Sequence, residues 1–240
     1  MHDNQGGIYL PLPSIAQRDI PAASAGHCTA QTILGDGHGT RKNAESWLEL
    51  CNLYLLNAKQ DVAELREQEE FHFGWAPDDL DLHVFDVVAT LTSGIRIAYT
   101  VKPEVRLNSR PGSRDKNGER YDDRTFMEKM GNVTWWATEH TQLYHDVRLV
   151  TEADINQIDL RNAQMFAAVR EPDGEADAIA FAVAKAIPAE GGRSLRDLTI
   201  ETGLQARGYR ALIRLMRSGM LRAIQREIIR PTTIVHLPRR

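Results

Sequence analysis

The chain has 240 residues, of which 42% are hydrophobic and 26% charged, a composition that fits a folded globular protein rather than a disordered chain. No apolar run approaches the ~20 residues of a membrane helix, and the first residues lack the basic and apolar segments of a secretory signal, so we expect neither a membrane anchor nor export. Two cysteines without metal-ligand spacing exclude a disulfide framework and a zinc site, and fit a reducing cytoplasm.

The amino-terminal part of the chain is predicted to be an irregular arm over residues 1–42. Gly, Pro, Ser and Thr are frequent there and no period is sustained. The first helix is predicted from Asn43 to Asn57, because apolar residues recur at helical spacing and Asn43 is a suitable N-cap. This helix would carry Glu45.

Three β-rich runs follow, over residues 62–73, 83–90 and 95–101. The short loop between the second and third runs contains Gly94, which favours a hairpin. A polar stretch at 108–123, rich in charges with Pro and Gly, is predicted to be a surface loop.

A helix over 125–140, weakened around Gly131, and a strand over 146–150 are predicted next. This order of elements predicts an α/β domain over residues 43–155, with a mixed sheet flanked by helices. Residues 156–172 are predicted to be a helical connector.

The last part of the chain, residues 173–240, is predicted to be a small winged-helix domain. Three short helices precede two strand-like runs, which is the order of elements in a winged helix. The helices are expected at 176–186, 194–202 and 206–218, and the strand-like runs at 221–224 and 233–237.

Positive charge is concentrated in this last part. From Arg193 onward there are eleven Arg, no Lys and three acids, a net charge of +8, whereas the other 192 residues carry −12. Four arginines of the third predicted helix share one face, and three more extend the patch toward the strands. These are Arg207, Arg210, Arg214 and Arg217, followed by Arg222, Arg226 and Arg230. The patch predicts contact with the phosphates of double-stranded DNA, the alternative being a solvated or protein-binding face.

Three side chains have the chemistry of metal-dependent phosphodiester cleavage. Glu45, Asp86 and Lys102 follow one another as a helical carboxylate, a strand carboxylate and a lysine that ends the next strand. Carboxylates hold Mg²⁺ or Mn²⁺, and a lysine supplies positive charge near the attacking water or the scissile phosphate. A structural ion pair between Asp86 and Lys102 is the alternative. His83 is expected on the opposite face of the strand from Asp86, outside any shared metal site.

Several motifs of this region resemble those of the TnsA family of transposon-end endonucleases. They are Glu45-Ser-Trp-Leu-Glu49, Leu65-Arg-Glu-Gln68, an aspartate in an apolar strand, Val101-Lys102-Pro103, Trp135-Trp136 and Val150-Thr-Glu-Ala-Asp-Ile155. The resemblance covers about residues 43–155, and the winged helix matches the two-domain plan of the family. It implies a restriction-endonuclease-like fold of the PD-(D/E)xK kind that cleaves DNA at transposon ends with one or two Mg²⁺ or Mn²⁺ ions. It also implies a DDE-type transposase and an AAA+ ATPase as partners, at the nucleoid in the cytoplasm.

On this resemblance Glu45 and Asp86 are the metal ligands and the lysine is catalytic. The family has Gln or Glu two residues before the lysine, where this chain has Thr100, whose hydroxyl is able to ligate a metal or hold a metal-bound water. The main-chain carbonyl of Val101 is a further candidate ligand, and Gln68 is expected near the site as an accessory residue. Thr100 leaves an alternative function open, a catalytically inactive DNA-binding protein with a nuclease fold and a winged helix.

Overall fold

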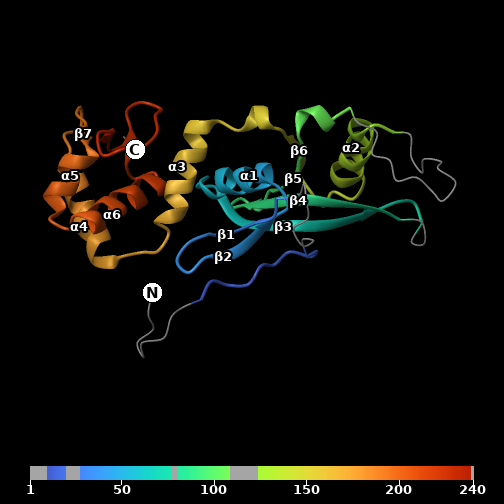
Figure 1. The fold of residues 1–240 in the computed structure, drawn as a ribbon, viewed down its shortest axis with the longest axis horizontal. Coiled ribbons are helices and arrows are strands. Elements are labelled where there is room, and N and C mark those ends of the chain that lie inside the picture. The colour runs from blue at the N-terminus through green and yellow to red at the C-terminus, as the bar shows by residue number, and fades with distance from the viewer. Residues whose placement is uncertain (1–9, 20–27, 77–79, 109–123, 239–240) are drawn as a thin grey trace.

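The computed structural model describes residues 10–19, 28–76, 80–108 and 124–238. An amino-terminal α/β half and a carboxy-terminal helical half are joined through helix α3 (Gln157–Ala168) (Figure 1). The surface loop predicted at 108–123 lies almost entirely outside the described residues. None of the described helices is long and apolar enough to cross a membrane.

A mixed sheet of four strands, in the order β3-β4-β5-β6, forms the centre of the amino-terminal half. The strands are β3 (Val62–Phe73), β4 (Asp81–Leu91), β5 (Arg96–Val101) and β6 (Asp146–Val150). β3, β4 and β5 pair antiparallel in succession, and β5 pairs parallel with β6. The four strands predicted over these ranges are confirmed, because apolar β-rich runs and the Gly94 turn specify them locally.

Helices cover both faces of this sheet. Helix α1 (Trp47–Asn57) lies on one face, where its leucines meet side chains of β3, β4 and β5 in one apolar cluster. Helix α2 (Phe126–Trp135) lies on the other face, where Phe126, Met130 and Val133 meet a second cluster from β3 and β4. The predicted α/β class, with a mixed sheet flanked by helices, is confirmed (Figure 1).

The amino-terminal segment is more regular than the sequence predicts. β1 (Ala30–Leu34) and β2 (Thr40–Ala44) form an antiparallel hairpin, so the prediction of an irregular arm through residue 42 is wrong for its last part. Helix α1 begins after the N-cap Ser46 rather than at Asn43, because Asn43 is still paired within β2. Glu45 therefore lies in the link between β2 and α1, not on the helix as predicted.

Helix α2 passes through Gly131 without a break. A capping box at Thr125 and the burial of Met130 and Val133 hold the helix, and they offset the cost of one glycine, about 1 kcal/mol. The irregularity comes later, in a π-helical turn at Trp136–His140. The prediction of a weak point at Gly131 is therefore wrong.

The carboxy-terminal half contains three further helices and a small three-stranded sheet. They are α4 (Gly174–Lys185), α5 (Leu195–Thr202) and α6 (Ala206–Arg217), with β7 (Arg193–Ser194), β8 (Arg222–Ala223) and β9 (Ile234–His236) in the order β7-β9-β8. Their apolar core is built from residues between Val169 and Val235. The three predicted helices and two strand-like runs are confirmed, whereas β7, with two residues, is too short to leave a period in the sequence.

Candidate active site

The pairing of β3 with β4 shifts in register between Val62 and Glu64, and it is interrupted again at Gln68. Glu67 pairs with Val87 and Glu69 pairs with Phe85, but Gln68 between them has a φ of 52°. A positive φ is uncommon for a residue with a side chain and persists only where the surroundings hold it. Gln68 is 0% exposed, so this irregularity lies inside the protein.

The same irregularity breaks the alternation of side chains along β4. Val87 belongs to the cluster under α1, whereas Phe85 joins Val88 in the cluster under α2. Strict alternation would put Phe85 on the same face as Val87. The alternation on which the expected placement of His83 opposite Asp86 depends is therefore interrupted between Phe85 and Val87, and His83 contacts Thr100 whereas Asp86 contacts Val101.

Asp86 sits at this break, with its carboxylate against the end of β5. Its Oδ2 accepts a 2.6 Å hydrogen bond from the main-chain N–H of Val101. Burial, and then the nearby charge of Glu49, raise the pKa of Asp86 to about 7, against the opposing effects of the Val101 hydrogen bond and the Lys102 charge. The carboxylate therefore carries a full charge at neutral pH only if a cation compensates it.

Two glutamates lie beside Asp86, Glu45 in the link before α1 and Glu49 in the first turn of α1. Glu49 Oε2 accepts a 2.8 Å hydrogen bond from the main-chain N–H of Glu45, and Glu49 Oε1 accepts one of 2.8 Å from the Ser46 hydroxyl. Burial raises the pKa of Glu49. Sequence reasoning missed Glu49 as a site residue, although the Ser46-x-x-Glu49 pattern marks a helix start with a carboxylate in its first turn.

Lys102 follows β5 and brings positive charge to these carboxylates. Its Nζ lies 5.3 Å from the centre of the Phe126 ring. Its charge lowers the pKa of Asp86 and of Glu49, by less than burial raises them. In the described part of the chain Asp86 and Lys102 do not form a direct ion pair. The structure thus brings together Glu45, Asp86 and Lys102, the three residues predicted from the sequence. Glu49 is a fourth member of the site.

Thr100 and Val101 take different roles at the end of β5. The Thr100 hydroxyl is buried and lies 2.9 Å from Nε2 of His83. Burial, with the Lys102 charge, lowers the pKa of His83 to about 4, so this imidazole is neutral at pH 7. Val101 contributes its N–H to Asp86 and is in direct contact with that carboxylate.

The amino-terminal arm reaches the site through Arg18, which sequence reasoning did not single out because an isolated arginine in an irregular segment leaves no pattern. Arg18 Nη2 donates hydrogen bonds to Oε1 of Glu45 at 2.5 Å and to Oε1 of Gln68 at 2.6 Å. Gln68 thus lies next to Glu45. Two donors, Gln68 Nε2 and Arg18 Nε, are buried without a hydrogen-bond partner. They suit an incoming acceptor such as a phosphate oxygen.

These side chains fit the ligand preferences of Mg²⁺ and Mn²⁺. Mg²⁺ is usually held by one or two carboxylates and completed by water. Asp86 and Glu45 are the two acids suited to this role, because Glu49 uses both oxygens at the start of α1. Within the described ranges no three His, Cys, Asp or Glu residues come close enough to hold a metal ion, so a cage of protein ligands alone is not formed. The fit rests on the position of Asp86, where burial and then the nearby charge of Glu49 raise the pKa of a carboxyl group that a cation would compensate.

The predicted arginine row of α6 shares one face, as its spacing requires, but this face is turned toward acids of the same chain. Arg207 pairs with Asp173 and Glu175, Arg214 with Asp177, Arg217 with Asp36, and Arg226, beyond the helix, with Asp159. Arg210 donates to the carbonyl of Ala168 at 3.4 Å. Arg222 is exposed. The row therefore serves first to fix α6 against its neighbours.

No protein-family model matches this chain, and no curated protein matches it.

Proposed function

We propose that the protein is a metal-dependent DNA endonuclease of the kind found in the TnsA family. The observation that supports this proposal is the meeting of Glu45, Glu49, Asp86 and Lys102 at one break in the sheet, where burial and then the charge of Glu49 raise the pKa of Asp86. Acidic oxygens and a lysine at one place suit hydrolysis of a phosphodiester.

Each residue of the site has a distinct role in this proposal. Asp86 and Glu45 hold the divalent ion, which when bound lowers the pKa of a water and polarises the scissile phosphate. Lys102 places its ammonium near the attacking oxygen or the phosphate. Glu49 fixes the link that carries Glu45, through the hydrogen bond it accepts from the Glu45 N–H. Gln68 has an unpaired buried donor suited to a phosphate oxygen.

The fold supports the same proposal. A mixed sheet between two helices, with one acid in the first turn of a helix and another within a strand, is consistent with the restriction-endonuclease-like domain that the resemblance implies. Three helices followed by β8 and β9 have the order of a winged helix, which would contact DNA. Exposed Arg222 is available for phosphate contact, whereas the α6 arginines would have to exchange acidic partners for phosphates. A DDE-type transposase and an AAA+ ATPase are the partners proposed by resemblance.

A non-catalytic DNA-binding protein is the second candidate. Two observations favour it: the Thr100 hydroxyl is engaged by His83, and the Arg18 guanidinium already bonds Glu45. In this reading the nuclease-like half keeps its shape and the carboxy-terminal half binds DNA.

Cleavage of supercoiled plasmid and of labelled duplex in Mg²⁺ and in Mn²⁺ tests the first proposal. Asp86→Asn and Lys102→Ala are expected to reduce cleavage about 100-fold or more. Lys185→Ala is a matched control for Lys102, because its Nζ also lies over an aromatic ring, 4.3 Å from the centre of Phe181, and it is expected to cleave as the wild type does. Asp146→Asn is the matched control for Asp86→Asn.

Cleavage that survives both site substitutions would overturn the assignment of the site. If the wild type does not cleave, alone or with a DDE-type transposase added, and binds duplex with a strong dependence on salt, the second candidate holds. A thermal-denaturation series with Mn²⁺ adds a readout that does not need activity. Stabilisation by the ion that Asp86→Asn removes supports the metal site.

A further inference from the structure

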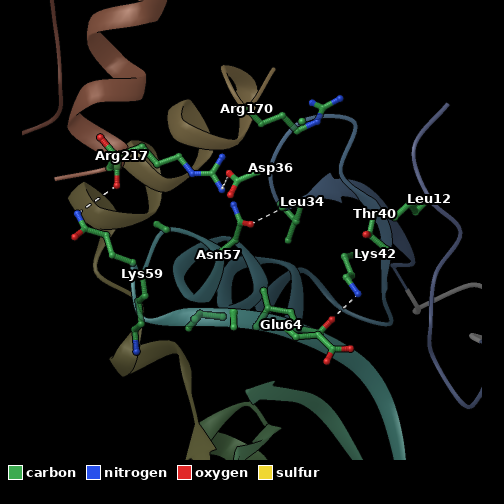
Figure 2. Close-up of a pocket in the computed structure, with 18 of the residues that line it drawn as sticks. Leu12, Leu34, Asp36, Thr40, Lys42, Asn57, Lys59, Glu64, Arg170 and Arg217 are labelled. Atoms are coloured by element: carbon green, nitrogen blue, oxygen red, sulfur yellow. Dashed lines mark hydrogen bonds and ion pairs between the residues drawn. The ribbon is translucent and has the colours of Figure 1, made fainter. Parts of the chain in front are cut away.

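A cavity of about 900 Å³ lies between the two halves of the chain, away from the carboxylates of the candidate active site (Figure 2). Neither Glu45 nor Asp86 lines it. Its walls come from the β1–β2 turn, the end of α1, the start of β3, the segment after α3 and the end of α6. A volume of this size is in the range of small-molecule sites, roughly 300–1,000 Å³.

Asn57, the last residue of α1, presents an unsatisfied donor to this cavity. Its Oδ1 accepts a 2.8 Å hydrogen bond from the N–H of Gly35, and this fixes which way the amide is turned, because an NH₂ group cannot accept that bond. The Nδ2 on the other side is buried without a hydrogen-bond partner, in a residue that is 9% exposed. An unpaired buried donor is destabilising, and an acceptor from a ligand would remove this cost.

A second unsatisfied donor belongs to Arg170. Its Nε is buried without a partner, while its Nη2 bonds the adjacent and half-exposed Glu171 at 3.1 Å. Figure 2 shows the Arg170 side chain over the β1–β2 turn, and the Asn57 side chain beside Asp36 and Arg217. Both unsatisfied groups are donors, so the missing partner is an acceptor rather than a donor.

Positive charge outweighs negative charge on the cavity wall. The charged lining residues are Lys42, Lys59, Arg170, Arg214 and Arg217 against Asp36 and Glu64. Lys42 is neutralised by buried Glu67, and Arg214 by Asp177. Among the described residues, the ion-pair partner of Arg217 is Asp36, whose side chain is 90% exposed, so solvent weakens this pair and a ligand anion is able to replace Asp36. The wall therefore favours an anionic ligand.

Apolar residues also line the cavity. They are Leu12, Pro13 and Ile15 of the arm, together with Leu34, Val62 and Ala63. Leu12 and Ile15 are partly exposed and present apolar surface to the cavity. A ligand with an anionic end and an apolar or planar body would satisfy both the charged and the apolar lining residues.

We infer that this cavity binds a phosphate ester of nucleotide size, with the phosphate against Asn57, Arg170 and Arg217 and the base or sugar against the arm. Arginine and amide donors are the usual partners of phosphate oxygens. A free mononucleotide and the terminal phosphate of a DNA strand share this chemistry. Because Asn57 and Arg217 come from different halves of the chain, an occupied cavity also fixes the halves against each other.

Isothermal titration calorimetry of the full chain tests this inference, with AMP, inorganic phosphate, and a thymidine dinucleotide with and without a 5′-phosphate as probes. Asn57→Asp is the diagnostic variant. It keeps an oxygen for the Gly35 N–H and replaces the donor with a negative oxygen, so it is expected to fold normally and to bind about tenfold or more weakly. Arg170→Gln is expected to weaken binding as well. Arg193→Gln, which removes the same charge outside the cavity lining, is expected to bind as the wild type does.

Saturable binding of AMP supports a free nucleotide as the ligand. Binding of the dinucleotide only when it carries the 5′-phosphate supports a strand end. The inference is overturned if no probe binds the wild type, if inorganic phosphate binds as tightly as AMP and the phosphorylated dinucleotide, or if Asn57→Asp, with an unchanged circular dichroism spectrum, binds as tightly as the wild type. None of these readouts depends on cleavage, so they are separate from the test of the endonuclease.

Discussion

At the scale of single residues, Asp86 and His83 have pKa shifts that act on stability in opposite directions. The pKa of Asp86 is raised from 3.8 to about 7, so between these values the folded protein binds a proton that the unfolded chain does not, and stability falls as pH rises. The pKa of His83 is lowered from 6.5 to about 4, so in that window the unfolded chain binds the extra proton and stability rises with pH. The two effects largely cancel in the wild type between about pH 4 and 6.5.

Removing one of the two groups should therefore reveal the pH dependence that the other group contributes to stability. Relative to wild type, Asp86→Asn is expected to gain stability as pH rises from 4 to 7, and His83→Gln to lose it as pH rises from 4 to 6.5. The limiting slope is about 1.4 kcal/mol per pH unit. Urea unfolding in a chelating buffer across this range measures both. Variant curves parallel to that of the wild type would contradict the opposing shifts.

Gln68 has a positive φ and is completely buried. Two variants separate the energetic cost of its backbone conformation from the contribution of its side chain. Gln68→Ala removes the hydrogen bond from Arg18 but keeps a side chain in the left-handed region. Gln68→Gly removes the same bond and relieves the backbone. We expect the glycine variant to be more stable than the alanine variant by about 1 kcal/mol in urea unfolding. Since glycine normally destabilises a strand, the opposite order would show that the backbone at this position is not strained.

At the scale of elements, the β1–β2 hairpin is fixed to β3 by a buried ion pair. Lys42 Nζ lies 2.8 Å from Glu67 Oε2 and donates to the Leu65 carbonyl at 2.6 Å, and the Ser14 hydroxyl donates to the other oxygen of Glu67. Lys42 is 4% exposed and Glu67 is 0% exposed. A buried pair of this kind is sensitive to the loss of one partner, because the other is left as an unpaired charge.

Lys42→Met is expected to destabilise the protein by about 3–5 kcal/mol, because Glu67 is left buried without its cation. The double variant Lys42→Met/Glu67→Leu is expected to recover much of that loss, because it removes both charges and fills the same space. Thermal and urea unfolding of the two variants measure the difference. A double variant no more stable than Lys42→Met would mean that the pair is held mainly by its hydrogen bonds to Leu65 and Ser14.

The sequence was sufficient for those elements that are specified locally. The apolar, β-rich runs predict β3 to β6. The Ser46-x-x-Glu49 pattern marks the observed start of α1. The β1–β2 hairpin was missed because its strands pair polar residues around a glycine-rich turn, with little apolar alternation. The break at Gln68 could not be foreseen, since it depends on packing on both sides of the sheet rather than on any local preference.

The same distinction applies to the candidate site. Asp86 could be predicted because it interrupts an apolar strand, and Lys102 because it follows one. The pairing of these neighbouring strands brings the two residues together. Glu45 was placed on the wrong element, yet it reaches the site from the adjoining link. Arg18 and Glu49 arrive through tertiary contacts: a hydrogen bond between residues 18 and 45, and a charge that acts on Asp86.

At the scale of the whole molecule, the halves differ in charge and an ion pair links them. The spacing of the α6 arginines gives their shared face, but their acidic partners could not be read from it. The partners lie in the first turn of α4 and in the β1–β2 turn, far apart along the chain. Arg217 of the basic half pairs with Asp36 of the acidic half, at 2.9 Å. The contact between halves therefore uses a residue that the sequence assigns to DNA.

The carboxy-terminal half is expected to fold by itself, because its buried core lies wholly between Val169 and Val235, supported by Phe166 of α3. The fragment 156–240 has fourteen basic and nine acidic side chains, a net charge of +5. We expect a cooperative thermal transition by circular dichroism, at a lower temperature than that of the full chain, because Leu160 is no longer covered by the amino-terminal half.

Without Asp36, Arg217 becomes available, so the fragment should bind duplex DNA more tightly than the full chain does. Arg217→Gln in the fragment should then lower the dependence of log affinity on log salt by about one. A fragment that melts cooperatively but shows no salt-dependent affinity would limit the arginine row to holding the halves together.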